Sequence, residues 1–166
     1  MAELTPTERL QPSLLDRLTD EEPAHSQESR NRRVLSIQKL RESVLRDVAW
    51  LLNTTNLAQS DLAEKHPLVA QSVVNYGLPD LAGLTASAVD IGELESLVRQ
   101  AIWDFEPRIL RHTLKVRAHA ADEMTHNALV FEIAGELWAQ PVPLELFLKT
   151  EIDLESGEIA VSEVTR

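Results

Sequence analysis

The chain has 166 residues, and its 16 Lys and Arg against 27 Asp and Glu give a formal net charge of -11. This length fits one domain with a substantial core and a tail, and the acidic balance argues against nonspecific nucleic-acid binding, which needs cations to neutralise phosphates. The absence of cysteine excludes disulfides, thiol nucleophiles and zinc–thiolate sites. Without a long apolar run or a signal peptide, we expect a cytoplasmic protein that does not insert into a membrane.

Residues 1–31 are predicted to form a mobile N-terminal tail, because they contain three prolines and most of a polar run at 19–33. Inside this tail Ser13 precedes a single amphipathic turn, in which Leu14, Leu15 and Leu18 share one face. Such a turn either docks on a partner or folds back onto its own domain, and the sequence leaves both open. Residues 32–166 are predicted to form one domain.

Two long helices are predicted, over residues 33–52 and 87–105, because apolar residues recur there at helical spacing. The spacing of Ser87 and Asp90 resembles a capping box at the start of the second helix. A shorter helix is predicted over residues 67–74. A turn around Gly77 follows it, since glycine tolerates a left-handed backbone.

Strand spacing follows over residues 109–119, 128–139, 144–154 and 158–164. The last two segments flank a short turn with Gly157 and are predicted to pair as a hairpin. Short connections favour antiparallel order. The predicted fold class is therefore α+β: two main helices plus a short helix packed on one face of a mostly antiparallel sheet of about four strands.

The outward faces of the first two predicted strands carry opposite charges. Arg111, Lys115 and Arg117 share one face of the first strand, and Glu132 and Glu136 share one face of the second. Cross-strand pairs of this kind contribute about 0.2–1 kcal/mol each. They explain the basic face without an anion site.

The tripeptide Glu106-Pro107-Arg108 stands where helical spacing changes to strand spacing. Pro107 disfavours the α conformation at Glu106 and so ends the helix. Glu106 and Arg108 are two residues apart in an extended segment, so their side chains leave on the same side. A local ion pair at a helix-to-strand junction is one interpretation of this motif.

Catalytic chemistry finds little support in the sequence. Glycoside hydrolysis needs two carboxylates flanking one cleft, and spacing singles out no second carboxylate beside Glu106. His112, His119 and His126, with Asp122 and Glu123 between them, lack the spacing of a metal site and are interpreted as polar loop residues. No glycine-rich phosphate loop and no serine elbow occur. We therefore predict a non-enzyme with no cofactor and no metal.

Several motifs, in this order along the chain, resemble the family of TssE and of the small phage baseplate wedge protein once labelled lysozyme-like. They are residues 12–18, 40–53 and 72–81, then Glu106-Pro107-Arg108, and then 131–137. The resemblance implies a structural component of the baseplate of a type VI secretion system. By position, it makes Glu106, Pro107 and Arg108 interface residues at the bundle of the larger wedge subunits. Leu14, Leu15 and Leu18 are predicted to belong to the protein interface as well.

The same resemblance implies the partners. They are the wedge proteins TssF, TssG and TssK, the sheath subunits TssB and TssC, and the hub spike protein, with the first sheath ring templated on this fold. The implied location is the cytoplasmic baseplate docked at the inner membrane. Two alternatives are a muramidase-like glycoside hydrolase, which the old family label suggests, and a small regulatory adaptor on the same fold.

Overall fold

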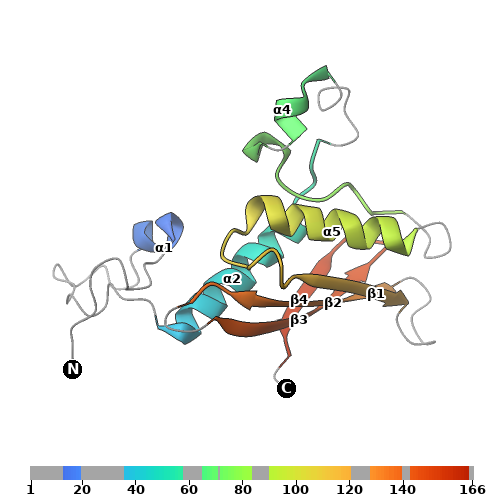
Figure 1. The fold of residues 1–166 in the computed structure, drawn as a ribbon. Coiled ribbons are helices and arrows are strands. Elements are labelled where there is room, and N and C mark those ends of the chain that lie inside the picture. The colour runs from blue at the N-terminus through green and yellow to red at the C-terminus, as the bar shows by residue number, and fades with distance from the viewer. Residues whose placement is uncertain are drawn as a thin grey trace, which may run out of the picture.

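The computed structural model describes residues 13–19, 36–57, 65–70, 72–83, 90–120, 128–139 and 143–164. A four-stranded sheet with the order β1-β2-β3-β4 forms one layer, and every neighbouring pair of strands is antiparallel. Helices α2 and α5 lie together on one face of this sheet (Figure 1). The fold is therefore α+β with an antiparallel sheet, as predicted. The predicted boundary between residues 31 and 32 lies outside the described residues.

Helix α2, Ile37–Leu52, begins at Ser36, whose hydroxyl accepts a hydrogen bond from the Lys39 amide at 3.1 Å. Its buried face is the predicted apolar stripe, together with one serine: Leu40, Ser43, Val44, Val48, Leu51 and Leu52. The first residues of the predicted helix, 33–35, lie outside the described residues. The helix ends at its C-cap Asn53, whose side-chain amide also pairs with the backbone of Ile159 in β4.

Helix α5, Ile91–Phe105, buries Leu94, Val98, Ala101 and Ile102. Its N-cap is Asp90, whose carboxylate accepts hydrogen bonds from the Gly92 and Glu93 amides at 2.8 and 3.1 Å. Asp90 was predicted to sit inside the helix, three residues after a Ser87 cap. That assignment is wrong, because a carboxylate at the N-cap satisfies two free amides directly. Ser87 itself lies outside the described residues.

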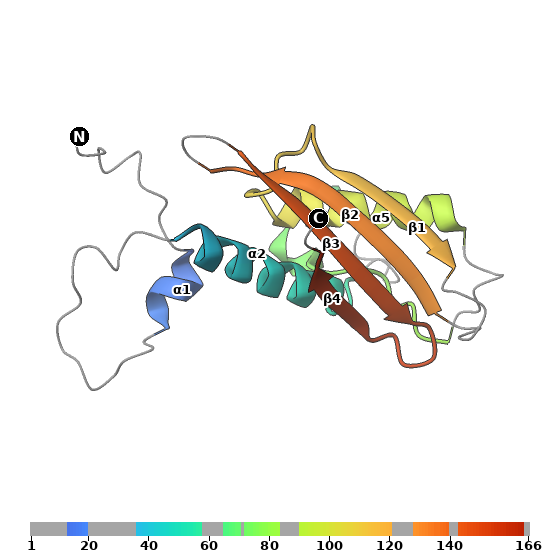
Figure 2. The same cartoon turned by 90° about the horizontal axis from the view of Figure 1, so that it is seen from below.

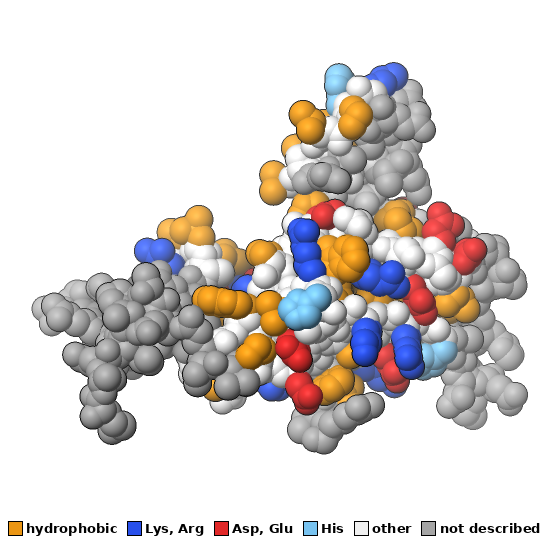
Figure 3. All heavy atoms as spheres, viewed as in Figure 1, with side chains coloured by type: hydrophobic (Ala, Val, Ile, Leu, Met, Phe, Trp, Pro, Cys, Tyr) orange, Lys and Arg blue, Asp and Glu red, His pale blue; other side chains and the backbone are white. Residues whose placement is uncertain are grey.

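The short predicted helix at 67–74 is two pieces, α4 at Pro67–Ala70 and the 3₁₀ turn η2 at Val73–Asn75. This segment projects from the helical layer, and hydrophobic side chains stand on its surface (Figure 3). It returns to the domain at Gly77, which has a φ of +119°. A Cβ there would lie 2.0 Å from the Thr54 carbonyl oxygen, so only glycine allows this close approach.

Strands β2 at Ala128–Leu137, β3 at Leu144–Asp153 and β4 at Ile159–Glu163 match their predicted segments closely. The turn between β3 and β4 contains Gly157 with a φ of +75°, as predicted for this hairpin. Figure 2 shows the four strands side by side, with β1 and β4 at the two edges. The inward side chains of the sheet pack with α2 and α5 into one core.

The first predicted strand, 109–119, is wrong in its first half, because β1 covers only Lys115–Ala120. Ile109 makes an isolated bridge to Leu137, and a turn then leaves the sheet, closed by the Thr113 amide on the Leu110 carbonyl at 3.0 Å. The Thr113 hydroxyl replaces the missing backbone partner by accepting from the Glu136 amide at 2.9 Å. A side-chain hydrogen bond of this kind competes with the strand ladder, and alternation alone does not reveal it.

Candidate functional site

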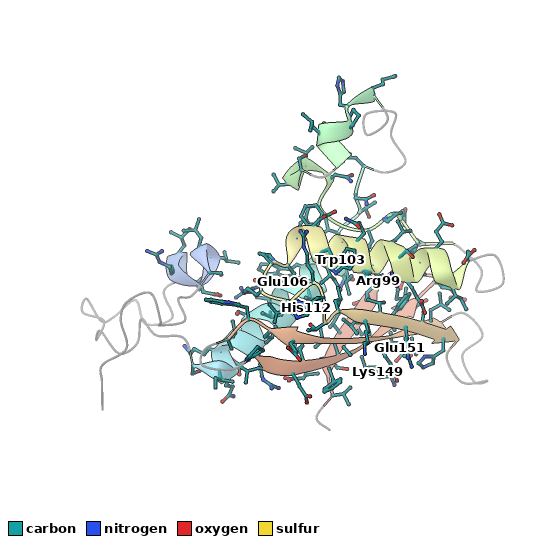
Figure 4. All side chains as sticks on the ribbon, in the orientation of Figure 1. Arg99, Trp103, Glu106, His112, Lys149 and Glu151 are labelled. Atoms are coloured by element: carbon teal, nitrogen blue, oxygen red, sulfur yellow. The ribbon has the colours of Figure 1, made fainter. Side chains whose placement is uncertain are left out.

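The motif Glu106-Pro107-Arg108 lies at the C-terminal end of α5, where Figure 4 places Glu106. Glu106 is the C-cap of α5, and its backbone leaves the helical conformation at φ -122° and ψ 76°. The Arg108 amide and Arg108 Nε both donate to Glu106 Oε1, at 3.1 and 2.7 Å. Arg108 Nη2 also contacts Glu106 Oε2. The predicted local ion pair is confirmed, but the motif leads from the helix into a turn rather than directly into a strand, because the Ile109 amide donates to the Glu106 carbonyl at 3.2 Å.

The arginine of this motif also reaches across to α2. Its Nη2 donates to Asp47 Oδ2 at 2.6 Å, and its Nη1 donates to the Ser43 hydroxyl at 3.2 Å. Glu106 is only 3% exposed, so its charge is almost wholly removed from water. A buried carboxylate of this kind requires a paired cation. Arg108 therefore joins the end of α5 to the middle of α2 and neutralises a charge that burial would otherwise penalise.

The electrostatics of Arg108 follow from this geometry. Burial acts to lower the pKa of Arg108, but the hydrogen bonds and charge of Glu106, and then those of Asp47, outweigh burial and raise it. The guanidinium therefore stays charged and pairs with both carboxylates. Both carboxylate oxygens of Glu106 contact Arg108, so this side chain holds the conformation of the motif.

Beside the motif lies an open cavity of about 350 Å³. Its wall combines apolar and charged groups from four segments: Ser13, Asp47, Leu51, Tyr76, Phe105, Glu106, Pro107 and Arg108. The rings of Tyr76 and Phe105 meet edge to face with centroids 5.2 Å apart. The cavity wall therefore combines apolar surface with a few fixed polar groups.

Tyr76 reaches the cavity because the segment 72–81 is fastened to the end of α2. The Leu78 amide donates to the Thr54 carbonyl at 2.8 Å, and the Leu57 amide donates to Asn75 Oδ1 at 2.9 Å. Burial, then the negative charges of Asp47 and Glu106, raise the pKa of the Tyr76 phenol. The sequence predicts a turn over residues 76–80 but gives no sign that Tyr76 lines a cavity, which the packing of Tyr76 on Phe105 reveals.

The tail motif forms helix α1, Leu14–Leu18, and Ser13 at its N-cap lines the cavity. Asp16 Oδ1 accepts from Arg46 Nη1 at 2.7 Å, and Arg46 Nε donates to Asp47 Oδ1 at 2.9 Å. Burial acts to raise the pKa of Asp16, but its hydrogen bonds with Ser13 and Arg46 and the charge of Arg46 lower it. A chain of alternating charges therefore runs from α1 to Glu106.

The three leucines of α1 point into solvent rather than onto the domain. Leu14, Leu15 and Leu18 are 69%, 42% and 74% exposed, and Figure 3 shows hydrophobic side chains on the outer surface of α1. The sequence left open whether this turn folds back onto its own domain or docks on a partner. In the structure the polar side of α1 contacts the domain through Asp16 and Arg46, whereas its apolar side remains exposed. The structure thus places Glu106, Pro107 and Arg108 in the wall of the cavity, whereas Leu14, Leu15 and Leu18 are not part of that wall and only their N-cap Ser13 is.

Of the three histidines considered as metal ligands, the structure describes His112 and His119. His112 lies on an exposed turn and His119 on the exposed face of β1, whereas His126, Asp122 and Glu123 lie outside the described residues. Within the described segments, no group of three or more His, Cys, Asp or Glu side chains is arranged to hold a metal. Likewise, none of the helices in the described part of the chain is long and apolar enough to cross a bilayer.

Comparison with known proteins identifies the family. A family model described as baseplate wedge protein gp25 matches residues 38–142, which run from α2 to the segment after β2 and include Glu106-Pro107-Arg108. No curated protein and no solved structure gives a significant match. The family match covers more than half of the chain and confirms the predicted family. The chain therefore belongs to the gp25 family of baseplate wedge proteins, whose role is structural, in the baseplate of a phage or a type VI secretion system.

Proposed function

We propose that this chain is a non-enzymatic wedge component of the cytoplasmic baseplate of a type VI secretion system, docked at the inner membrane. In this role it joins the wedge proteins TssF and TssG, with TssK further out and the hub spike protein at the centre. It also templates the first ring of the sheath subunits TssB and TssC. The family match supports the baseplate role, and the choice among secretion partners is our inference.

The observation that carries this proposal is the cavity beside Glu106-Pro107-Arg108. Pro107 is exposed and lines the cavity, while Glu106 and Arg108 are occupied with each other and with Asp47. The motif therefore acts by shaping the cavity, and Pro107 and the outer edge of Arg108 are the parts a partner touches. We infer that the cavity receives the helical bundle of TssF and TssG.

Helix α1 extends the same docking surface. Because Ser13 lines the cavity and Asp16 is tied to Arg46, the exposed Leu14, Leu15 and Leu18 stand beside the cavity rather than far from it. Exposed leucines next to a partly apolar cavity are typical of a protein interface. We infer that α1 and the cavity bind the same wedge bundle.

The test is co-purification of TssF and TssG with the full chain. The variant Pro107→Arg places a long charged side chain at the cavity wall while leaving the Glu106–Arg108–Asp47 contacts in place. We expect it to reduce recovery of TssF and TssG at least about tenfold, which corresponds to about 1.4 kcal/mol. The matched control Gln100→Arg adds the same side chain at an exposed position of α5 outside the cavity, and it should bind normally.

Equal recovery with Pro107→Arg and with Gln100→Arg would show that the cavity is not the wedge interface. The competing classes give different results again. Cleavage of peptidoglycan that is lost in Glu106→Gln would make the chain a hydrolase. Recovery of a protease or response regulator, without wedge or sheath proteins, would make it an adaptor.

A further inference from the structure

A group of basic side chains begins at the C-terminal end of α5, directly after the motif Glu106-Pro107-Arg108. Residues 107–121 contain arginines, histidines and a lysine but no carboxylate, in a chain whose net charge is -11. Figure 3 shows Lys, Arg and His side chains gathered over α5, the turn after it and β1. Cations that an acidic chain concentrates in one place create a local positive potential, which attracts a partner of opposite charge.

The end of α5 holds the centre of this basic group in place. Arg111, on the turn after the helix, donates from Nη2 to the Trp103 carbonyl at 2.7 Å. A cation often binds the last carbonyls of a helix, but this bond leaves most N–H groups of the guanidinium unused, and Arg111 is exposed. Arg99 and Trp103 are neighbours on the surface of α5, and Figure 4 shows both on the same side of the molecule as His112.

Lys115, the first residue of β1, completes the group. It faces Ala134 on β2, which in turn faces Phe147 on β3, so no carboxylate stands directly across the sheet from Lys115. Further along β1, Arg117 faces Glu132 and belongs to the mixed charges of the outer face of the sheet. The name basic corner is used below for four residues: Arg99, Arg111, His112 and Lys115.

Two carboxylates of α5 already have other partners. Glu95 accepts from the Ala118 amide at the edge of the sheet at 2.8 Å, and the two oxygens of Asp104 accept from Gln100 Nε2 at 3.0 and 2.9 Å. Within the described residues, no salt bridge involves the cations of the basic corner, Arg99, Arg111 and Lys115. The positive charge of the corner is therefore not neutralised by an ion pair among these residues.

The basic corner continues the wall of the cavity along the chain. Pro107 and Arg108 line the cavity, and the turn closed by the Ile109 amide on the Glu106 carbonyl at 3.2 Å leads directly to Arg111. Arg108 is occupied by the carboxylates of its own domain, whereas the cations of the corner are not. A partner that occupies the cavity and extends past the end of α5 therefore meets unpaired positive charge at the rim of its interface.

We propose that the basic corner binds an acidic segment of the wedge subunits TssF and TssG, beside the part of their bundle that enters the cavity. The assignment rests on the proposed function, because that function supplies the wedge subunits. Carboxylates of the acidic segment pair with Arg99, Arg111 and Lys115. Charges at the rim of an interface mainly raise the rate of association and orient the partner, and salt weakens their effect.

The first experiment measures the rate at which the full chain associates with purified TssF and TssG at several salt concentrations. Arg99→Glu with Lys115→Glu reverses two charges of the corner, and Lys39→Glu with Lys149→Glu makes the same net change at exposed positions outside it. At low salt the corner variant should associate at least about tenfold more slowly than the wild type, whereas the control variant should match the wild type. High salt should bring the rates of all three proteins together.

The second experiment uses the wild-type chain, so it does not depend on the folding of a variant. A carbodiimide joins a lysine amine to a carboxylate only where the two groups are in contact, and mass spectrometry identifies the joined peptides. In the complex with TssF and TssG, Lys115 should be joined to an acidic peptide of one of these subunits. Lys149, which is exposed two strands away on β3, should not be joined to either subunit.

Equal association rates of the corner and control variants at low salt, or a complex in which Lys115 is joined to neither TssF nor TssG, would overturn the assignment and leave the wedge function standing. Binding of the wild-type chain to vesicles of anionic lipid, lost in the corner variant while its association with TssF and TssG stays normal, would assign the corner to a membrane surface instead. If the wild-type chain binds TssF and TssG at no salt concentration, the proposed function itself is wrong, and the assignment of the corner falls with it.

Discussion

Two sets of complementary charges in this molecule have opposite consequences. At the end of α5, Arg108 lies between Glu106 and Asp47, largely removed from water. On the outer face of the sheet, Arg117, Glu132 and Lys149 stand opposite one another across three strands, all exposed. None of these three is within salt-bridge distance of a partner among the described residues. Burial, rather than charge order, separates a structural cluster from a solvated surface.

This difference in burial predicts how much a substitution in each set of charges lowers the free energy of unfolding. In the buried cluster, removing one partner leaves a charge that water cannot reach. On the sheet face, water solvates whatever remains. The cluster also determines the shape of the cavity, so a change there alters stability and binding together. A change on the sheet face should alter neither by much.

The largest expected effect is that of Arg108→Ala. It leaves Glu106 buried and unpaired, and we expect the free energy of unfolding to fall by about 3–5 kcal/mol. Chemical denaturation of the purified chain measures this loss. The neutral double variant Glu106→Gln with Arg108→Met should recover most of it. If Arg108→Ala were as stable as the wild type, Glu106 would have to be solvated, and the contrast between the buried cluster and the exposed sheet face would be wrong.

A smaller loss is expected for Asp47→Asn. Arg108 keeps its bonds to Glu106, while the charge-assisted bonds that Arg108 and Arg46 donate to Asp47 weaken. Hydrogen bonds to charged groups contribute about 1.5–3 kcal/mol, so we expect a loss at or below the lower end of that range in the same denaturation assay. Glu42→Gln, an exposed neutralisation on the same helix, should change stability by under about 0.5 kcal/mol.

The titration of Tyr76 reports the same cluster without a stability measurement. The chain has one tyrosine, so its ultraviolet absorbance against pH follows Tyr76 alone. The pKa of the phenol should lie above its ordinary value of 10.0. Because the pKa is raised in the folded state, its contribution to stability is present below the unfolded pKa and is lost as pH rises through the folded pKa.

Asp47→Asn removes one of the two negative charges that raise the pKa of Tyr76, so the titration midpoint should move down towards that of an unfolded control. An unchanged midpoint would show that burial alone sets the pKa, and it would weaken the assignment of Asp47 to the cluster.

The smallest effect is expected for Arg117→Ala. Its opposite residue is Glu132, but both are exposed. Exposed pairs contribute between zero and about 1 kcal/mol. A double-mutant cycle with Glu132→Ala should give a coupling under about 0.5 kcal/mol that disappears at high salt. A salt-resistant coupling would mean that the outer face is buried against a partner.

The cross-strand charge pattern was predicted only in part. Arg117 does face Glu132, but Arg111 lies on the turn before β1, and Lys115 faces Ala134. Glu136 faces Glu145, a like charge on β3. The error arises from register: the turn at residues 111–113 shifts which residues face each other, and a one-residue shift changes the face as well.

The sequence alone determined the two long helices, the three strands β2, β3 and β4 and the β3–β4 hairpin, because periodicity and glycine positions are local properties. The resemblance of its motifs to a known family identified the family. The sequence also predicted the pair of Glu106 with Arg108, although a turn, and not the extended segment expected, brings the two side chains together. Only the tertiary structure decided that Asp47 and Ser43 complete the cluster and that Tyr76 lines the cavity. The same holds for Asn53 and Glu95, which occupy opposite edges of the sheet. Each of these contacts joins residues more than twenty positions apart, and no local pattern encodes which distant side chain will meet a free backbone group.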